Sequence, residues 1–236
     1  MGRRPIVRKR GSSPKYRAHS IIRVAPSKYP QVNPADTVTK GRVLQLVHDP
    51  GRGAPLALIE LENKVKFFTL ASEGTYVGQE VEVGKKTPVK LGNILTLAEM
   101  PEGTYVCNVE RKPGDGGALF RSSGNYAVII GKSGGMVTLK DAKGRLFLIK
   151  GDSLATVGIV AGGGRTEKPF LKAGNKLKLM RSKGRRYPIV RGVAMAAVHH
   201  PHGGGRHQHV GGSTSISRRL SPGAKVGLIS PKRTGR

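Results

Sequence analysis

The sequence predicts an all-β fold, with two small antiparallel barrels in the middle of the chain and a long, basic, irregular extension at each end. Two observations predict this arrangement. Short runs of β-forming residues recur about every ten residues through the middle, and Lys and Arg gather outside that region. Evenly spaced short strands separated by Gly and Pro turns are typical of small barrels.

The N-terminal extension comprises residues 1–35. Residues 1–28 contain nine Lys and Arg and no Asp or Glu. No apolar run follows the opening MGRRPIVRKRG, so we expect no secretory signal. No run anywhere in the chain approaches the roughly 20 apolar residues that span a bilayer, so we do not expect this chain to be a membrane protein.

The middle of the chain divides into a first barrel at residues 36–100 and a second at residues 101–190. The expected strands of the first are RVLQLVH (42–48), PLALIEL (55–61), KVKFFTL (64–70) and ILTLA (94–98). Those of the second are TYVCNV (104–109), YAVII (126–130), GMVTLK (135–140), RLFLIK (145–150) and ATVGIV (155–160). Turn signals such as Asp49–Pro50–Gly51 and Lys143–Gly144 separate the runs, and no long helix is expected.

The C-terminal extension comprises residues 191–236 and includes HHPHGGGRHQHVGG at 199–212. Pro and Gly recur too often for a helix or a central strand. Few bulky apolar groups are present to offset roughly 1–2 kcal/mol per residue of backbone entropy, so we expect both extensions to be disordered without a partner. Glycine would let the backbone approach a phosphate or a base closely.

The charge distribution predicts a polyanionic partner. Lys and Arg total 42 against 14 Asp and Glu, a formal net charge of +28. Residues 168–236 contain sixteen bases and no acid, so with residues 1–28 the ends hold +25, whereas residues 29–167 hold about +3. Nucleic acid fits best, because each phosphate neutralised by Lys or Arg releases a counterion. We expect the chain to bind neither a membrane nor a small-molecule substrate.

Five histidines lie between His199 and His209, which raises metal binding and catalysis as alternatives. A glycine-rich segment does not hold ligands in a tetrahedron, and no carboxylate after Glu167 is available nearby to orient an imidazole. Base stacking and hydrogen bonding to RNA are the favoured roles. Gly131–Lys132–Ser133 lacks the upstream Gly of a phosphate-binding loop, because Tyr126 stands in its place.

Most aromatic side chains of the middle region are expected to pack in the core. Tyr187 differs, since Arg185 and Arg186 precede it and Arg191 follows. A ring among guanidinium groups suits base stacking combined with phosphate pairing.

VRGVAMAAV followed by HHPHGGG (190–205) resembles the signature of the large-subunit ribosomal protein L-two family (universal uL-two). PEGTYVCNVE (101–110), KPGDGGALFRSSG (112–124), ATVGIVAGGGRTEKPFLKAGN (155–175) and ISPKRTGR (229–236) are similar to segments of its archaeal branch. The likeness covers essentially the whole chain and is weakest in residues 1–60.

The resemblance implies an OB-like barrel followed by an SH3-like barrel, with extensions that enter the RNA of the large ribosomal subunit. It implies a non-enzymatic, cytoplasmic ribosomal constituent near the peptidyl transferase region, with roles in subunit association and tRNA positioning. The implied partners are large-subunit rRNA and neighbouring ribosomal proteins, with tRNA and the small subunit contacted indirectly. No cofactor is expected beyond Mg²⁺ shared with rRNA. The alternatives are a non-specific nucleic-acid architectural protein and direct participation of His200 in peptidyl transfer.

The residues expected to bind rRNA are mainly bases of the extensions and Gly-rich loops, with Tyr187 and the His–Gly turn. They are Arg3, Arg4, Arg8, Lys9, Arg10, Lys15, Arg17, Arg121, Arg165, Lys168, Lys172, Lys176, Arg185, Arg186, Tyr187, Arg191, Met195, His200, His202, Gly203, Gly204, Gly205, Arg206, Arg218, Arg219, Lys232 and Arg233. No catalytic or metal-binding residue is expected. Many relatives read Asn-x-Val-Asp before the His-Pro, whereas this chain has Ala196 to His199, so an acid that would orient His200 is missing.

Overall fold

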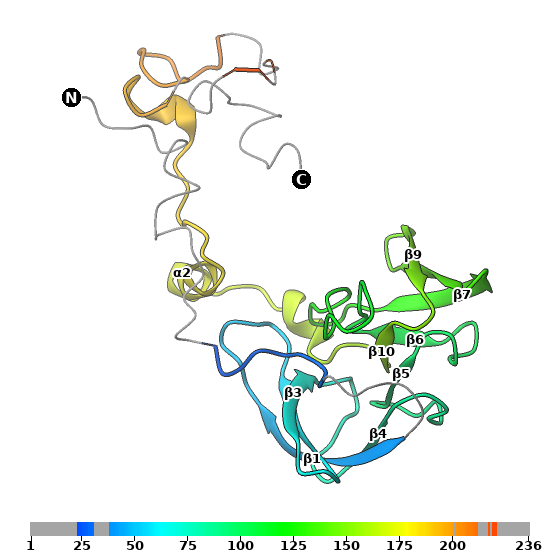
Figure 1. Cartoon of the computed structure of the whole chain (residues 1–236). Helices are drawn as coiled ribbons and strands as arrows, with labels where there is room; N and C mark the ends of the chain where they lie inside the picture. Colours follow the sequence, from blue (N-terminus) through cyan, green and yellow to red (C-terminus); the bar gives the residue numbers. More distant parts are fainter. Residues whose placement is uncertain (1–22, 31–37, 201, 212–216, 218, 221–236) are drawn as a thin grey trace. The chain divides into compact units, whose positions relative to one another are not determined.

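The computed structural model describes residues 23–30, 38–200, 202–211, 217, 219 and 220 (Figure 1). The chain divides into two compact units. We call Ser20–Pro169 the core unit, and Met1–His19 together with Phe170–Arg236 the arm unit.

The described part of the core unit is built almost entirely from strands. They are β1 (Thr39–Val47), β2 (Leu56–Leu61), β3 (Lys66–Leu70), β4 (Glu80–Val83), β5 (Ile94–Thr96), β6 (Tyr105–Cys107), β7 (Ala127–Ser133), β8 (Met136–Asp141), β9 (Leu146–Lys150) and β10 (Leu154–Val157), followed by a 3-10 helix, η3 (Gly163–Thr166). Their order in the sheet is β3-β2-β1-β4-β5-β10-β6-β7-β8-β9. Only the β4–β5 pair is parallel. The all-β fold class is confirmed, whereas the barrel types and the limits 36–100 and 101–190 stay predictions.

Each of the nine β-rich runs overlaps one strand, but β4 was not expected from the sequence. Its residues are Glu-Val-Glu-Val, and the two valines are buried while Glu80 is exposed. Glutamate is depleted in strands, so the alternation of this short segment gives a weak signal. The pairing of β4 with β1 buries Val81 and Val83 all the same.

The hairpin from β7 to β8 shows how the turn residues set the register. Ser133 pairs with Met136, which leaves Gly134 and Gly135 as a two-residue loop. Their φ angles are 55° and 75°, and a tight hairpin turn with positive φ at both positions favours glycine. The sequence Ser-Gly-Gly therefore fixes which residues face each other across the two strands.

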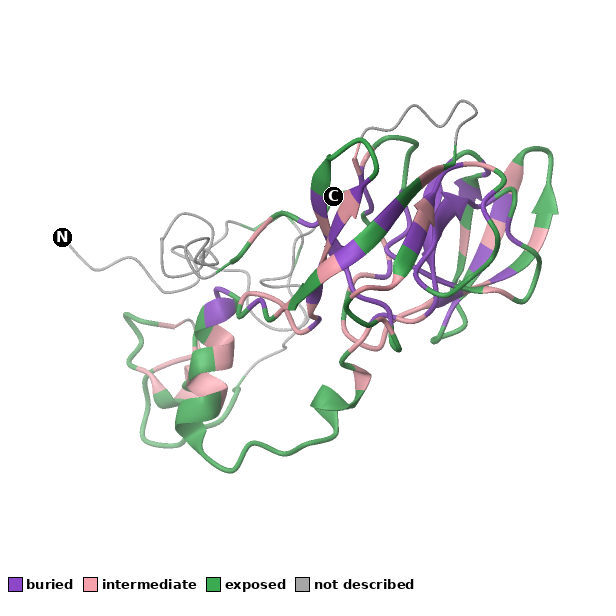
Figure 2. Cartoon of the chain, turned by 90° about the horizontal axis from the view of Figure 1, so that it is seen from below, coloured by how far each residue is buried: buried purple, intermediate pink, exposed green. Residues whose placement is uncertain are grey.

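Two main clusters of buried side chains support the sheet (Figure 2). One includes Leu97, Met100, Val106, Ile129 and Leu139. The other includes Val43, Ile59, Leu61, Val81 and Val83. Strands such as β4 and β8 alternate buried and less buried residues, the pattern of a sheet with one buried face, whereas every residue of β5 and β10 is buried.

A third, smaller cluster joins the strands of the two halves and contains the single cysteine of the chain. Cys107 packs with Leu56, Leu70 and Val160. Burial raises the pKa of the Cys107 thiol to about 12, although a weak hydrogen bond with Ser72 acts in the opposite direction. The thiol therefore stays protonated at neutral pH.

A segment of the N-terminal extension, residues 23–30, packs on the core unit. The Tyr29 side chain is 5% exposed, and its hydroxyl donates to the carbonyl of Asn108 at 2.8 Å and lies 2.6 Å from Oγ1 of Thr156. The backbone N–H of Lys28 donates to the carbonyl of Phe68 on β3. Burial is the main reason that the pKa of Tyr29 is raised well above its usual value. These contacts tie the described part of the extension to the sheet.

The loop after β6 is organised around the buried carboxylate of Glu110. Its two oxygens accept hydrogen bonds from the backbone N–H groups of Gly114, Gly116 and Leu154, at 2.9 to 3.2 Å. A buried carboxylate is costly unless it is hydrogen-bonded, and here three donors meet that need. The Gly-rich segment KPGDGG is thus held against the core.

The arm unit contains α2 (Ala173–Ser182) and a 3-10 helix, η4 (Gly192–Ala194), among its described residues. The sequence patterns had not predicted a helix as long as α2. The helix ends at Ser182, and Gly184 follows with a φ of 63°, which allows the N–H of Gly184 to donate to the carbonyl of Arg181 and the N–H of Arg185 to that of Met180. This pair of bonds is the Schellman arrangement that glycine favours. None of the helices in the described residues has the length and apolar character needed to cross a bilayer.

Candidate nucleic-acid interface

The arm unit lacks a buried apolar core in its described residues. Leu171 is 85% exposed and Ile189 is 72% exposed, whereas every apolar side chain that is buried lies in the core unit. The described bases of this unit are Lys172, Lys176, Lys178, Arg181, Lys183, Arg185, Arg186, Arg191, Arg206 and Arg219. No Asp or Glu follows Glu167 in the sequence, so no acid of this segment can neutralise them.

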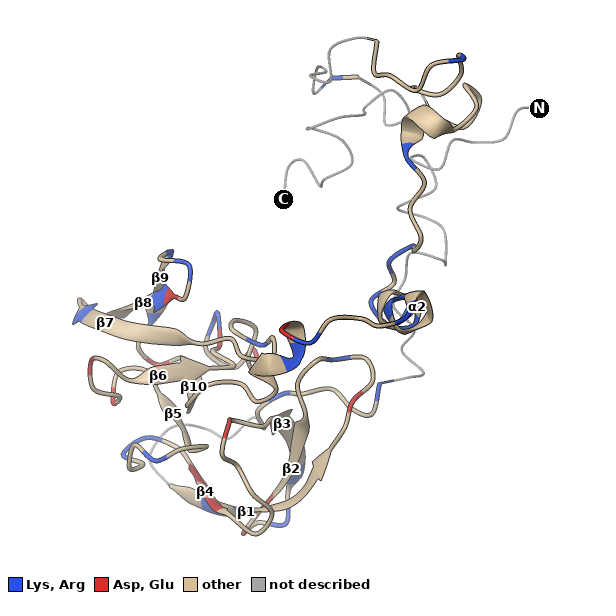
Figure 3. Ribbon diagram, turned by 180° about the vertical axis from the view of Figure 1, so that it is seen from behind, with Lys and Arg blue, Asp and Glu red and all other residues tan. Residues whose placement is uncertain are grey.

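Helix α2 concentrates part of this charge (Figure 3). Lys, Leu, Met and Arg favour helices, and they make up most of its sequence AGNKLKLMRS. Its first turn contains no acidic residue. The helix therefore presents Lys176, Lys178 and Arg181 on a short rigid element, a suitable arrangement for phosphate oxygens.

Tyr187 follows the end of α2 and lies against one of its lysines. The ammonium group of Lys176 is 5.3 Å from the centre of the Tyr187 ring, within the range of a cation–π contact. Arg185 and Arg186 are exposed beside it. The structure thus adds Lys176 to the aromatic ring that the sequence had grouped with neighbouring arginines.

The chain then closes a compact turn around two glycines. The N–H of Gly203 donates to the carbonyl of His200, and the N–H of Gly204 donates to that of Met195. A Cβ on Gly203 would lie 2.5 Å from the carbonyl oxygens of Met195 and Ala196. A Cβ on Gly192 would collide with the imidazole of His200. Gly203 therefore requires glycine if the turn is to close, whereas a side chain at Gly192 would displace the imidazole of His200.

The histidines of this segment form two ring pairs. The rings of His200 and His202 meet edge to face at 5.3 Å, and those of His207 and His209 stack at 5.9 Å. The N–H of His202 donates to Nδ1 of His200 at 3.1 Å. Within the described part of the chain, no three His, Cys, Asp or Glu side chains are grouped so that they could hold a metal ion.

Arg191 connects the two ends of the turn. Its guanidinium donates to Oε1 of Gln208 at 2.7 Å. The side chain is exposed, and one hydrogen bond uses only part of the five N–H donors of an arginine. It can therefore stabilise the turn and still bind a phosphate.

A second basic group lies on the core unit, around the Gly51–Arg52–Gly53 turn. The guanidinium of Arg52 makes an ion pair of 2.8 Å with the buried Asp49 and donates to the carbonyl of Ala25. A Cβ on Gly51 would lie 2.5 Å from Arg23, and one on Gly53 would lie 2.6 Å from Arg165. The small residues of the turn therefore let two long basic side chains lie across it.

Arg121 belongs to this group but has its donors engaged within the protein. Its guanidinium donates to the carbonyls of Gly117 at 2.8 Å and Ser27 at 2.7 Å. Burial, followed by the nearby charge of Arg52, lowers its pKa from the usual value. Arg121 therefore fastens the 23–30 segment to the Gly-rich loop and adds positive charge at the same place.

The predicted rRNA-binding residues are divided among the core unit, the arm unit and the residues outside the described part of the chain. Those of the core unit are Arg121, Arg165 and Lys168, and the last two are exposed. Those described in the arm unit are Lys172, Lys176, Arg185, Arg186, Tyr187, Arg191, Met195, His200, His202, Gly203, Gly204, Gly205, Arg206 and Arg219. Outside the described residues lie Arg3, Arg4, Arg8, Lys9, Arg10, Lys15, Arg17, Arg218, Lys232 and Arg233.

Arg23, Arg52, Lys178 and Arg181 lie in these basic groups but were not among the predicted residues. A sequence signal was present for Arg52, because it stands between two glycines in a turn. Arg23 had no such signal, since its place depends on the packing of the 23–30 segment. Lys178 and Arg181 become neighbours only through the helical spacing of α2.

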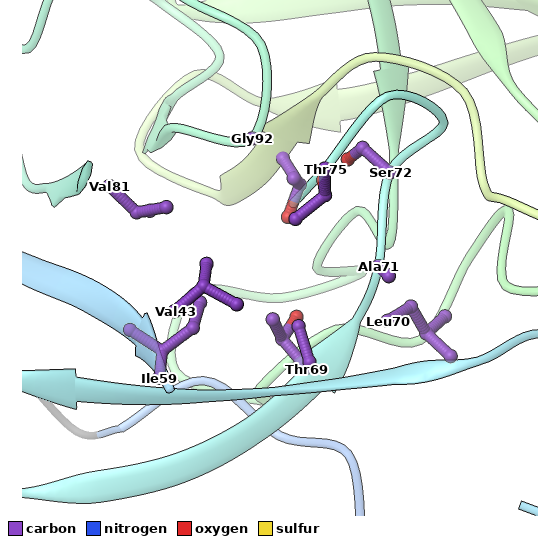
Figure 4. Close-up of a pocket in the computed structure, with 11 residues that line it drawn as sticks. Val43, Ile59, Thr69, Leu70, Ala71, Ser72, Thr75, Val81 and Gly92 are labelled. Atoms are coloured by element: carbon purple, nitrogen blue, oxygen red, sulfur yellow. The ribbon is translucent and has the colours of Figure 1, made fainter. Parts of the chain in front are cut away.

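A small cavity lies between the strands of the first half of the core unit (Figure 4). Its volume is about 10 Å³, and Val43, Ile59, Thr69, Thr75 and Thr156 are among its lining residues. Oγ1 of Thr75 is buried and has no hydrogen-bond partner. The space is close to that of one water molecule, which Thr75 would hold, and is far below the size of a small-molecule site.

Comparison with known proteins gives one consistent result. Residues 7–83 match the family model described as Ribosomal Proteins L2, RNA binding N-terminal domain, and residues 90–223 match Ribosomal Proteins L2, C-terminal domain. Among similar proteins is that of Hyperthermus butylicus, 49% identical over all of this chain and 99% of the relative. Others are those of Cenarchaeum symbiosum, at 47% over 100% and 97%, and Korarchaeum cryptofilum, at 45% over 100% and 96%. All three bear the name large ribosomal subunit protein uL2.

Proposed function

The chain belongs to the ribosomal protein L2 family, and from this premise we propose that its basic groups bind large-subunit rRNA near the peptidyl transferase region. The chain is a structural, non-enzymatic constituent of the large ribosomal subunit and acts in the cytoplasm, where translation takes place. Its finer role is to support subunit association and the positioning of tRNA. It acts on the small subunit and on tRNA through the rRNA that it orders.

The main support for this proposal is that the described part of the arm unit has no buried apolar core and contains no Asp or Glu. None of its described apolar side chains is buried, and its turn at Gly203 and Gly204 is closed by local backbone hydrogen bonds. Such a segment gains little free energy from its own packing. A dense array of phosphates supplies the missing stabilisation, because each contact releases a counterion.

The group around the Gly51–Arg52–Gly53 turn suits a second contact with rRNA. Arg165 is exposed there, and its guanidinium lies 3.3 Å from Oγ of Ser123, a weak hydrogen bond that leaves donors available. The N-terminal extension passes the same place through residues 23–30. Binding of rRNA here would hold the extension and the sheet together.

The His200 geometry supports a positioning role. Nδ1 of His200 accepts a backbone N–H, and its ring packs on Gly192, so the imidazole is built into the turn. A general base needs hydrogen-bond reach to the reacting groups and a suitable orienting partner. The position before His200 that holds an acid in many relatives is His199 here. We assign His200 to holding the turn and the rRNA that surrounds it.

The proposal is tested by the salt dependence of binding to isolated large-subunit rRNA. A triple variant, Arg185→Gln, Arg186→Gln and Arg191→Gln, should lower the slope of log affinity against log salt by about 2–3 units, because each phosphate contact contributes about 0.7–0.9. The matched control replaces three exposed core bases, Lys64→Gln, Lys86→Gln and Lys90→Gln. Equal slopes for the two variants would contradict the proposal.

Competition separates this function from that of a non-specific architectural protein. Duplex DNA at the same phosphate concentration should displace the rRNA only weakly, because the Tyr187 and His–Gly contacts need unpaired bases. Equal competition by the two nucleic acids would favour the non-specific function.

A further inference from the structure

The two edges of the ten-stranded sheet differ in how they are covered. At one end, β3 has a neighbour from the chain itself, because the N–H of Lys28 donates to the carbonyl of Phe68 at 3.0 Å. At the other end, β9 pairs with β8, and no strand among the described residues lies on its other side. An uncovered edge presents a row of backbone donors and acceptors to another chain.

The register shows which backbone groups β9 presents. The N–H of Asp141 donates to the carbonyl of Arg145, and the N–H of Gly151 donates to that of Gly135. In an antiparallel pair the direction of the hydrogen bonds alternates along the strand. The N–H and C=O groups of Leu146 and Leu148 therefore point away from β8.

The side chains of the same two residues are exposed. Leu146 and Leu148 are each 65% exposed, whereas the next residue, Ile149, is buried. Two leucines at alternate positions of a sheet edge are unusual for a surface that faces water. Natural edge strands more often carry charge or proline at such positions.

The same face of the neighbouring strands carries two further apolar side chains, which Lys140 on β8 separates from Leu146. Tyr105 on β6 pairs with Val128 on β7, Val128 with Lys140 on β8, and Lys140 with Leu146 on β9. Paired residues share a face of the sheet, so these side chains form a row. Tyr105 is 49% exposed and packs edge to face on Tyr126 at 5.2 Å. We call Tyr105, Val128, Leu146 and Leu148 the β9 patch.

Lysines outnumber acids around the β9 patch, although the carboxylate of Glu102 lies beside Gly131 on β7. Lys132, Lys140 and Lys150 are exposed on β7, β8 and β9. The single acid between residues 127 and 150 is Asp141, which is buried and paired with Arg145. A partner that covers the leucines would therefore meet lysines at its margins.

We propose that the β9 edge binds an extended segment of another protein of the large subunit, which adds a strand beside β9. Its apolar residues at alternate positions would cover Leu146 and Leu148, and its acidic residues would pair with Lys140 and Lys150. Addition of a strand provides backbone hydrogen bonds, and the side-chain contacts provide specificity. An RNA strand would match the lysines but would leave both leucines in water. The inference rests on the proposed function, since the partner is sought in the large subunit.

Photocrosslinking in purified large subunits tests the proposal. A full-length chain with benzoylphenylalanine in place of Leu148 should form an adduct with one protein segment rich in acidic and apolar residues, identified by mass spectrometry. The control carries the same probe in place of Tyr76, which is 64% exposed elsewhere on the core unit. Adducts to rRNA, to a second copy, to the chain's own extensions, or to nothing above the control would overturn the inference.

Two variants separate strand addition from simple apolar contact. With the probe at Leu146, Leu148→Pro removes a backbone donor that points away from β8, and should lower the adduct yield about tenfold. An edge strand tolerates proline where the N–H faces outward. With the probe in place of Lys150, the double variant Leu146→Ser and Leu148→Ser should lower the adduct yield to a similar extent. This double variant replaces the proline variant as the test if the latter does not fold. Unchanged yields from folded variants would overturn the proposal.

Failure of the inference and failure of the proposed function give different results. Entry of the probe-bearing chain into large subunits is measured first, by its ratio to 23S-type rRNA in sucrose gradients. A chain that does not enter large subunits contradicts the proposed function and the inference with it. A chain that enters them and yields no protein adduct contradicts the inference alone.

Discussion

The core unit and the arm unit differ in where their apolar side chains lie. In the core unit, Leu56, Leu95 and Leu97 are completely buried, and the backbone is paired in a continuous sheet. In the described arm unit, Leu171 and Ile189 lie mostly in water. The core unit can offset its conformational entropy by burying apolar surface, whereas the arm unit has little surface to bury.

From this difference we infer that the two units have different sources of stability. The core unit has 20 Lys and Arg against 14 Asp and Glu, and its described strands pack around buried apolar clusters. The arm unit carries bases without acids, and its few fixed elements are the turn at Gly203 and the helix α2. We therefore expect substitutions in the described arm unit to affect rRNA binding and assembly more than the stability of the free protein.

The largest expected effect is in limited proteolysis with trypsin. In the free protein, cleavage at Arg185, Arg186 and Arg191 should be at least tenfold faster than at Lys140 and Lys150. All five side chains are exposed, but the backbone of the last two is paired in β8 and β9. Gel and mass analysis of timed samples gives the rates, and addition of rRNA should slow the arm cleavages. The fragment that remains should begin at or before Arg23, because residues 23–30 pack on the sheet.

Substitution of one leucine in each unit gives the next largest effect. Leu97→Ala in the core cluster should lower the free energy of unfolding by about 2–5 kcal/mol, because it removes buried contacts and leaves a cavity. Leu171→Ala should change it by less than about 0.5 kcal/mol. Urea titration followed by circular dichroism measures both. A comparable loss in the two variants would show that the arm unit has a core of its own.

Removal of one hydroxyl tests the junction between the N-terminal extension and the sheet. Tyr29→Phe should lower the free energy of unfolding by about 1–3 kcal/mol, since the carbonyl of Asn108 and Oγ1 of Thr156 lose a buried partner. Tyr76→Phe is the matched control, because Tyr76 is exposed. If both variants unfold at the same urea concentration, the 23–30 segment contributes nothing measurable to the fold.

The smallest effect on the free protein is expected for His200→Ala, which alters the arm turn alone. The midpoint of urea unfolding should not move, while incorporation into large subunits should fall, because RNA contacts worth about 1–3 kcal/mol are lost. Subunits that contain the variant at full occupancy should retain single-turnover peptide transfer within about tenfold. Loss of a general base typically costs about 10²–10⁴ in rate. A hundredfold lower rate of peptide transfer, with an unchanged pattern of chemical probing of the rRNA, would favour a catalytic role for His200.

The sequence predicted most of the core unit because its signals are local. Alternating apolar residues and Gly turns marked nine of the ten strands, and Gly134–Gly135 fixed a hairpin. The missed strand β4 has glutamates at two of its four positions, and its pairing with β1 depends on a contact about 40 residues distant in sequence. Tyr29 was missed because it stands in a segment defined by its charge, and its burial follows from tertiary packing.

The arm unit was predicted in composition rather than in conformation. Arg185, Arg186 and Arg191 were grouped with Tyr187 by sequence distance alone, whereas Lys176 approaches the Tyr187 ring only through α2. Few apolar residues mark that helix, although Gly184 after Ser182 and Lys183 was a usable stop signal. The approach of Arg23 and Arg165 to the Gly51–Arg52–Gly53 turn joins three distant segments, which no local pattern encodes.

The buried thiol of Cys107 makes the chain a convenient substrate for site-specific chemistry. It is the only cysteine in the sequence, and both its burial and its raised pKa protect it from alkylating reagents in the native state. A cysteine introduced on an exposed arm position can therefore accept a fluorophore while Cys107 remains unmodified. Under mild denaturant, the rate at which the Cys107 thiol is labelled would report the rate at which the core around it opens.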